Sequence, residues 1–195
     1  MLTALKEIIN PNTIINYDTA SNVLKLKEEG IDSKVAVLHI SHIPKDALAF
    51  TLDHQPKKDA QKYKQLSLYV SSTNNTGVNK GCDLIVLWQE NKKNKALVFD
   101  LKSDRPKASA TEKQLNNSEL FLNYLISMAK EHYGKSNGIF EINKAIVTTN
   151  PRGVNKRATY QPNTQQINRH SYKVQNVNPS SSRSAKISFR QLVTV

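Results

Sequence analysis

Short apolar segments separated by polar ones organise the N-terminal third of the chain. Residues 2–9 have helical spacing and stop near Asn10, which precedes a proline and is therefore biased away from the helical region. A second helix is predicted over residues 19–29, with a glycine directly after it as a C-terminal stop. Residues 34–40 alternate and are rich in β-branched side chains, and residues 47–52 are a second candidate, so we expect two strands here.

The central part of the chain has the clearest pattern. Residues 83–88 and 96–101 are two strongly apolar runs of strand length, and the polar run between them, residues 89–95, contains no proline. This pattern predicts a β-hairpin. A broad apolar stripe at the helical period then predicts a long helix over residues 111–133, and residues 140–148 form a last apolar strand.

The C-terminal part is polar and basic. After Glu141 the chain has nine Lys or Arg residues and no Asp or Glu, within a total of 28 basic and 16 acidic residues and a net charge of +12. Short strands are predicted only at residues 172–174 and 187–193. We therefore expect a core over residues 1–150 and a basic extension over residues 151–195, which packs on the core or trails from it. Such a charge excess attracts polyanions, of which nucleic acid is the most common.

Composition excludes several classes of protein. With 38% hydrophobic residues the chain is able to bury a core, yet it has no run of about 18 apolar residues, so no membrane association is expected. Cys82 is the single cysteine, which rules out an intrachain disulfide and a cysteine-rich zinc site. The N-terminus lacks the pattern of a secretion signal, and we expect a cytoplasmic protein.

Two aspartates and a lysine carry the candidate chemistry. If the predicted hairpin is antiparallel, the start of its first strand faces the end of its second, which brings Asp83 and Asp100 together. Alternation along a strand puts Asp100 and Lys102 on one face. Carboxylate oxygens are suitable ligands for Mg²⁺ or Mn²⁺, and the carbonyl of Leu101 is a further candidate ligand. A lysine beside such a site is able to hold the attacking water or stabilise charge on a phosphoryl group.

The order of these residues resembles a known family. Gly81-x-Asp83, then Asp100-Leu101-Lys102, then a helix bearing Gln114 is similar to the PD-(D/E)XK nuclease superfamily, which includes restriction endonucleases and recombination exonucleases. The resemblance implies an α/β fold: a restriction-endonuclease-like αβββαβ core with a four-stranded mixed sheet flanked by helices, here followed by the basic C-terminal extension. It also implies that Asp83 and Asp100 bind the metal and that Lys102 is the catalytic lysine.

The resemblance has two further implications for single residues. Gln114 matches a glutamine that several branches carry on the helix after the motif and is expected to be catalytic. Branches with a glutamine-x-x-x-tyrosine signature have tyrosine where this chain has Ser118, so the chain departs from the recombination exonucleases there. Many members also carry an acid on the first helix, for which Glu28 and Glu29 are the candidates.

These observations predict a Mg²⁺- or Mn²⁺-dependent nuclease that hydrolyses phosphodiester bonds, with DNA favoured over RNA, acting as an endonuclease. The alternatives are a catalytically inactive protein of the same fold that binds nucleic acid or regulates a partner, and a basic structural protein of a larger assembly. A homodimer and a subunit of a larger complex are both left open. The expected nucleic-acid contacts are basic residues near the constellation and at the start of the extension: Lys80, Arg105, Lys107, Arg152, Lys156 and Arg157.

Overall fold

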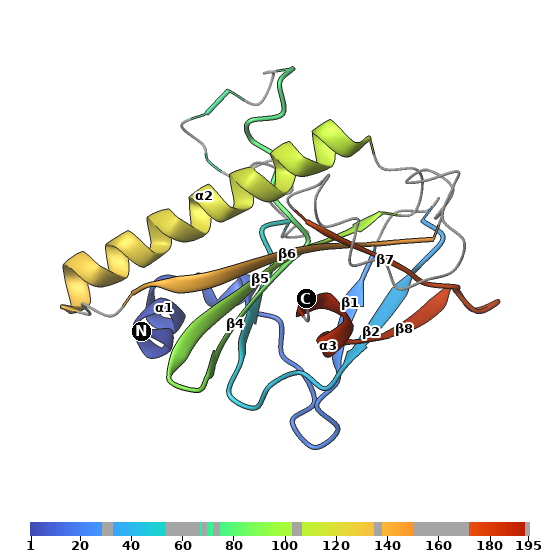
Figure 1. Ribbon diagram of the computed structural model, residues 1–195, viewed down its shortest axis with the longest axis horizontal. Coiled ribbons are helices and arrows are strands. Elements are labelled where there is room, and N and C mark those ends of the chain that lie inside the picture. Colours follow the sequence, from blue (N-terminus) through green and yellow to red (C-terminus); the bar gives the residue numbers. More distant parts are fainter. Residues whose placement is uncertain are drawn as a thin grey trace.

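The computed structural model contains both helices and strands and describes residues 1–28, 33–53, 67, 70–71, 75–102, 107–134, 138–149 and 172–193 (Figure 1). The elements follow one another in the order α1 (Leu2–Ile8), the 3₁₀-helix η1 (Pro11–Thr13), β1 (Leu24–Lys27), β2 (Val37–Ser41), β3 (Leu48–Phe50), β4 (Leu84–Glu90), β5 (Lys93–Lys102), α2 (Ala108–Tyr133), β6 (Phe140–Thr148), β7 (Lys173–Asn176), β8 (Ser184–Ser188) and α3 (Phe189–Val193). The protein is therefore a mixed α/β protein.

The larger of two mixed sheets has five strands in the order β3-β4-β5-β6-β7. Strands β3, β4 and β5 are antiparallel neighbours, whereas β5, β6 and β7 run parallel. The β4–β5 hairpin closes through Asn91 and Lys92, whose φ angles of 51° and 63° are the left-handed values that a type I′ turn requires. Helix α2 carries the chain from β5 to β6, because parallel neighbours need a long crossover connection.

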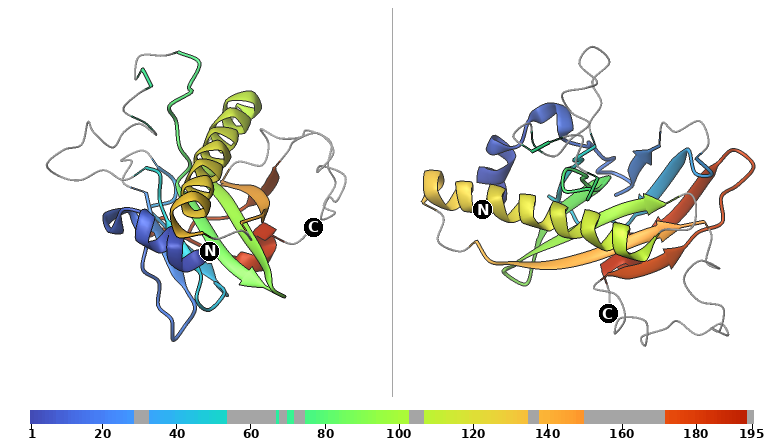
Figure 2. Two further views of the ribbon diagram at one scale, coloured as in Figure 1. Left: turned by 90° about the vertical axis from the view of Figure 1, so that its left-hand side faces the viewer. Right: turned by 90° about the horizontal axis from the view of Figure 1, so that it is seen from above.

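Both faces of the five-stranded sheet are covered, which explains why its central strands are continuous apolar runs rather than alternating ones. One face packs against α1 and α2, with Ile85, Val98 and Ile146 in that core. The other face packs against the three-stranded sheet and α3, with Val86, Phe99 and Val147 in the second core. Figures 1 and 2 show α2 lying along the first face.

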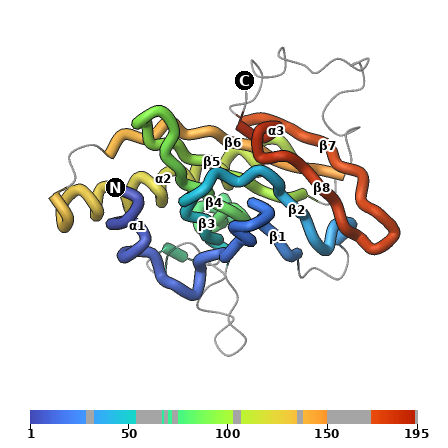
Figure 3. Tube along the Cα trace, turned by 90° about the horizontal axis from the view of Figure 1, so that it is seen from below, coloured from blue at the N-terminus to red at the C-terminus, as the bar shows by residue number. Residues whose placement is uncertain are grey.

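The three-stranded sheet has the order β1-β2-β8 (Figure 3). Its residues 24–27 correct the prediction of a helix over residues 19–29. Leu24 and Leu26 are buried while Lys25 and Lys27 are exposed, which is the period of two of a strand, and β2 supplies an antiparallel partner. On its other side β2 pairs in parallel with β8.

The remaining predicted elements are confirmed or corrected as follows. Helix α1, the β4–β5 hairpin, helix α2 and strand β6 are confirmed, and both strands of the hairpin extend into the run 89–95 that we predicted to be a loop. The predicted strand over residues 187–193 is wrong after its first two residues, because β8 ends at Ser188 and α3 occupies residues 189–193. The sheet also has five strands rather than four, because β7 pairs beside β6.

The described part of the predicted extension contributes to both sheets. Strand β7 lies at the edge of the five-stranded sheet, β8 lies beside β2, and the short helix α3 packs on the core between the sheets. The ring of Phe189 in α3 meets that of Trp88 in β4 edge-on, with ring centres 5.1 Å apart.

No helix within the described residues is both long and apolar enough to span a membrane.

Candidate functional site

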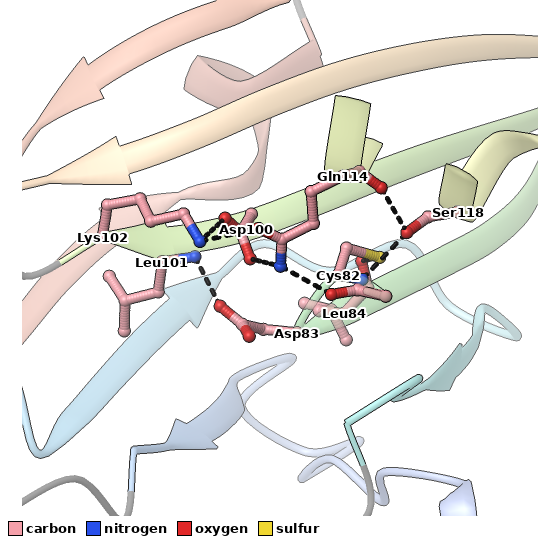
Figure 4. A network of polar contacts seen from close by, with 9 residues as sticks. Cys82, Asp83, Leu84, Asp100, Leu101, Lys102, Gln114 and Ser118 are labelled. Atoms are coloured by element: carbon pink, nitrogen blue, oxygen red, sulfur yellow. Dashed lines mark hydrogen bonds and ion pairs between the residues drawn. The ribbon is translucent and has the colours of Figure 1, made fainter. Parts of the chain in front are cut away.

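The open end of the β4–β5 hairpin brings the predicted residues together (Figure 4). Leu84 pairs with Phe99 in the antiparallel register, so one step further along each strand Asp83 lies opposite Asp100. Lys102 is two residues beyond Asp100 and on the same face, toward α2. The hairpin geometry on which the sequence prediction depended is therefore confirmed.

Asp100 is completely buried between the hairpin and α2. Its Oδ1 accepts a hydrogen bond from Nε2 of Gln114 at 3.1 Å. Its Oδ2 has no hydrogen bond of normal geometry and lies 2.5 Å from Nζ of Lys102. The side chain of Lys102 is 28% exposed, so this ion pair joins a buried carboxylate to an ammonium group at the border of solvent.

Asp83 is half-buried and close to Asp100. Its Oδ2 accepts a hydrogen bond of 2.6 Å from the backbone N–H of Leu101, which ties the start of β4 to the end of β5. Burial raises the pKa of the Asp83 carboxyl well above its usual range, and the negative charge of Asp100 raises it further, while the Leu101 N–H and Lys102 oppose both effects. The fold thus holds Asp83 where a second negative charge is unfavourable unless a cation is added.

The pKa of the Asp100 carboxyl is also raised. Burial raises the pKa of its carboxyl, the adjacent Lys102 lowers it, and the charge of Asp53 raises it. Asp53 follows β3 and is exposed; the sequence analysis did not single it out. The positive charge of one lysine is therefore outnumbered by two carboxylates at the hairpin end. The charge of a third acid, Asp53, is near enough to raise the pKa of Asp100.

Gln114, in the second turn of α2, connects all parts of the site. Its Nε2 donates to the carbonyl of Gly81 at 2.6 Å and to Asp100 Oδ1, and its Oε1 accepts from Nζ of Lys102 at 2.9 Å. One amide therefore fixes the catalytic-lysine candidate, the buried carboxylate and the backbone before Asp83.

Two further residues of α2 hold that backbone, and the sequence analysis missed both as positioning residues. The Ser118 hydroxyl accepts from the backbone N–H of Cys82 at 2.8 Å and donates to the carbonyl of Gln114. Asn117 Nδ2 donates to the carbonyls of Gly77 and Lys80 at 2.9 and 3.4 Å. The sequence signal was a run of short polar residues on a helix otherwise marked by an apolar stripe.

Cys82 lies beside the site but does not share its chemistry. Its side chain is fully buried, and burial raises the pKa of the thiol to about 12. A protonated, buried thiol is neither a metal ligand nor a nucleophile. Cys82 therefore acts as a small apolar residue under the hairpin end.

The donor set fits Mg²⁺ or Mn²⁺. Asp83 and Asp100 supply carboxylate oxygens, and the Oδ2 of Asp100 is a buried anionic oxygen whose near partner is the ammonium group of Lys102. The N–H of Leu101 points to Asp83, and since both polar groups of a strand residue face the same neighbour, its carbonyl is directed to that side too. Within the described residues no group of three or more His, Cys, Asp or Glu side chains is arranged so that it could hold a metal ion. One or two carboxylates are enough to bind Mg²⁺, because this ion keeps several of its water ligands, whereas a structural zinc ion takes four protein ligands.

The remaining predicted residues have different outcomes. Lys80 is exposed in the loop that Asn117 holds, and Lys107 is exposed at the N-terminus of α2. Glu28 follows β1 in the other sheet, so placing it on a helix is wrong. Other predicted residues lie outside the described part of the chain: Glu29, Arg105, Arg152, Lys156 and Arg157.

Comparison of the chain with models of protein families, with characterised proteins and with solved structures finds no significant match. The functional argument therefore depends on the side chains of the site.

Proposed function

We propose that this protein is a divalent-metal-dependent nuclease that hydrolyses phosphodiester bonds, with DNA as its substrate and internal cleavage as its mode. The observation that carries the proposal is the cluster at the hairpin end, where Asp83 and the fully buried Asp100 are opposed by one ammonium group, that of Lys102. A buried carboxylate beside a half-buried one is costly without a compensating cation, and sites with perturbed carboxylates are frequently functional.

Each residue has a distinct role in the proposed reaction. Asp83, Asp100 and the Leu101 carbonyl would hold the metal. When bound, the metal polarises a phosphoryl oxygen and lowers the pKa of a water molecule. Lys102 has three N–H donors, two of which are directed to Asp100 and Gln114 among the described residues. The third donor is suited to the attacking water or to a phosphoryl oxygen on which charge develops.

The order of elements supports a restriction-endonuclease-like core. Helix α1, strands β3, β4 and β5, helix α2 and strand β6 have the order αβββαβ once β1 and β2, which lie between α1 and β3 and belong to the other sheet, are left aside. Within this order Asp83 precedes β4, Asp100 and Lys102 end β5, and Gln114 lies on the next helix. These are the positions at which the PD-(D/E)XK resemblance predicts the motif.

A purified-protein cleavage assay tests the proposal. We expect nicking or cutting of supercoiled plasmid DNA with Mg²⁺ or Mn²⁺, loss of cleavage with EDTA, and loss in Asp100→Ala. Glu90→Ala, at the opposite end of the same hairpin, is the matched control and should cleave like the wild type. Parallel reactions with duplex RNA test the DNA preference. Equal cleavage by wild type and Asp100→Ala would contradict the proposal.

A catalytically inactive protein of the same fold remains the second candidate, because the described residues contain no third acidic ligand beside Asp83 and Asp100. Calorimetric titration with Mn²⁺ distinguishes the two. A nuclease should bind Mn²⁺ in the wild type and lose binding in Asp100→Ala, whereas an inactive site should bind no metal in either.

A further inference from the structure

The outer face of the three-stranded sheet has an unusual composition. Its inner side is buried against the five-stranded sheet and includes Leu24, Leu38 and Ile187. The alternate positions point away from that core and comprise Lys25, Lys27, Val37, His39, Ser41, Ser184, Lys186 and Ser188. None of these outward positions in the three described strands is acidic.

Three of these residues form a row across the sheet. Lys25 on β1 is directly opposite His39 on β2, and His39 is directly opposite Lys186 on β8. Neighbouring strands are about 4.8 Å apart, so the two lysines are attached roughly 10 Å from one another. Both lysine side chains are exposed, and Lys27 adds another exposed ammonium on the same face of β1. Opposite-charge partners on the same face would stabilise such a row, yet no outward position of the three described strands supplies one.

Among the described residues, Asp18 in the turn before β1 is an acid whose charge interacts with Lys25. A hydrogen bond from the Ser21 hydroxyl, then the backbone N–H groups of Ala20 and Ser21, lower the pKa of the Asp18 carboxyl most, and the charge of Lys25 adds a smaller effect. Asp18 is thus satisfied mainly by its own turn. It leaves the row with an excess of positive charge.

We infer that this outer face, centred on Lys25, His39 and Lys186, binds the phosphodiester backbone of nucleic acid. The inference deepens the proposed function, on which it rests, by assigning a second surface that contacts the same polyanion. Phosphate contacts are made mostly by Lys, Arg and short hydroxyl side chains, and Ser184 and Ser188 supply hydroxyls on either side of Lys186. Protein interfaces are enriched in aromatic residues and depleted in lysine and serine, so an acidic protein is the less suitable partner.

A binding assay without cleavage tests the inference. A fluorescently labelled 30-base-pair DNA duplex is titrated with protein in EDTA, over a series of salt concentrations, and its anisotropy is recorded. In the triple variant Lys25→Gln, Lys27→Gln, Lys186→Gln we expect affinity to fall at least about tenfold. The slope of log K against log salt should become shallower by about 2 to 3, since each lost phosphate contact removes about 0.9.

The control removes the same charge elsewhere. The triple variant Lys6→Gln, Lys93→Gln, Lys130→Gln alters exposed lysines away from this face and should retain nearly all of the affinity. An equal loss of DNA affinity in both triple variants would show that only the net charge of the protein matters, which would overturn the inference. Wild-type binding by the first triple variant would also overturn it, and would leave the face to an acidic protein.

A second variant separates binding from folding. His39→Glu places a carboxylate between Lys25 and Lys186, so Tm should stay unchanged or rise while DNA affinity falls. Unaltered affinity would count against the inference. Binding is measured in EDTA, and cleavage is measured separately with Mg²⁺ or Mn²⁺. A wild type that binds DNA through this face but does not cleave it with either metal would refute the proposed function alone. A wild type that cleaves but binds independently of this face would refute the inference alone.

Discussion

The two ends of the β4–β5 hairpin carry the same pair of chemical groups in different surroundings. At the closed end Nζ of Lys95 lies 2.7 Å from a carboxylate oxygen of Glu90, whose side chain is 55% exposed. At the open end Nζ of Lys102 lies 2.5 Å from a carboxylate oxygen of Asp100, whose side chain is 0% exposed. The two nitrogen–oxygen distances are similar, but one carboxylate is exposed to solvent and the other is buried.

The difference shows which ion pair needs a functional explanation. Exposed pairs stabilise proteins little, since water and salt screen them. A buried pair costs desolvation that its attraction often fails to offset, and here Asp83 adds a second carboxylate. The closed end is therefore an ordinary surface pair, whereas the open end is an arrangement that a bound cation would complete.

The largest expected effect separates the two lysines. Lys102→Met should lower the turnover of DNA cleavage about 10²- to 10³-fold, the size expected for loss of one group that stabilises transition-state charge, while Mn²⁺ still binds. Lys95→Met removes the same charge from the closed end and should leave turnover unchanged. Single-turnover cleavage and Mn²⁺ calorimetry measure both effects. Equal turnover in the two variants would remove the proposed distinction between the hairpin ends.

The next effect concerns the glutamine that holds the open end. Gln114→Ala should weaken Mn²⁺ binding or cleavage about 10- to 100-fold, because partners that orient metal ligands commonly contribute this much. Gln89→Ala, on the exposed part of β4 near the turn, is the control and should behave like the wild type. Calorimetry and cleavage rates report the difference, and wild-type values for Gln114→Ala would argue against its bridging role.

A smaller effect, in stability, follows from the raised pKa of Asp83. A carboxyl whose pKa is higher in the folded state contributes stability below its unfolded pKa and loses it as pH rises through the folded pKa. The carboxyl of Asp83 therefore lowers the stability of the metal-free protein at neutral pH, where the unfolded chain would ionise it freely. Asp83→Asn removes this cost and keeps an acceptor for the Leu101 N–H. We expect its Tm in EDTA to exceed that of the wild type at pH 7 to 8, with the difference shrinking as pH falls toward 4.

Metal and a second aspartate provide the controls for Asp83. Mn²⁺ should raise the Tm of the wild type, because a ligand of the folded state stabilises it, and should not raise that of Asp83→Asn. Asp18→Asn should have the opposite sign in EDTA, because the Ser21 hydroxyl and nearby N–H groups lower the pKa of Asp18 in the folded state. A lower Tm for Asp83→Asn at pH 7 would show that its carboxylate is stabilised without metal.

The smallest effect is expected at the closed end. Glu90→Gln removes the surface pair with Lys95 and should change Tm by less than about 2 °C, in low salt and in high salt alike. Thermal unfolding followed by circular dichroism is sufficient for this measurement. A large loss of stability would mean that the two hairpin ends differ less than their exposure indicates.

Local patterns predicted the fold well where partners are close in sequence. The two apolar runs of the hairpin and the helical period of α2 are local signals, and both elements were found as expected. The three-stranded sheet was not predicted, because β2 pairs with β8, and Val37 lies opposite Ser184 from the far end of the chain. Strand β1 has only four residues, so its alternation of apolar and polar residues was too short to be distinguished from the helical spacing expected over residues 19–29.

The candidate site divides in the same way. Asp83, Asp100 and Lys102 were brought together by hairpin geometry, which the sequence predicts from two apolar runs and a polar connection. Ser118 was noted only as the residue that stands where some nucleases have tyrosine. Its hydrogen bond to the Cys82 N–H depends on how α2 docks on the sheet, and no local pattern encodes that docking.

Trp88 gives the hairpin a built-in optical reporter. It is the single tryptophan of the chain, is 4% exposed, and meets Phe189 of α3 edge-on in the core between the two sheets. Its emission should be blue-shifted in the folded protein and should move to the red when α3 or the three-stranded sheet detaches. Since Trp88 lies near the turn and faces away from α2, that emission follows the assembly of the two sheets rather than events at the carboxylates.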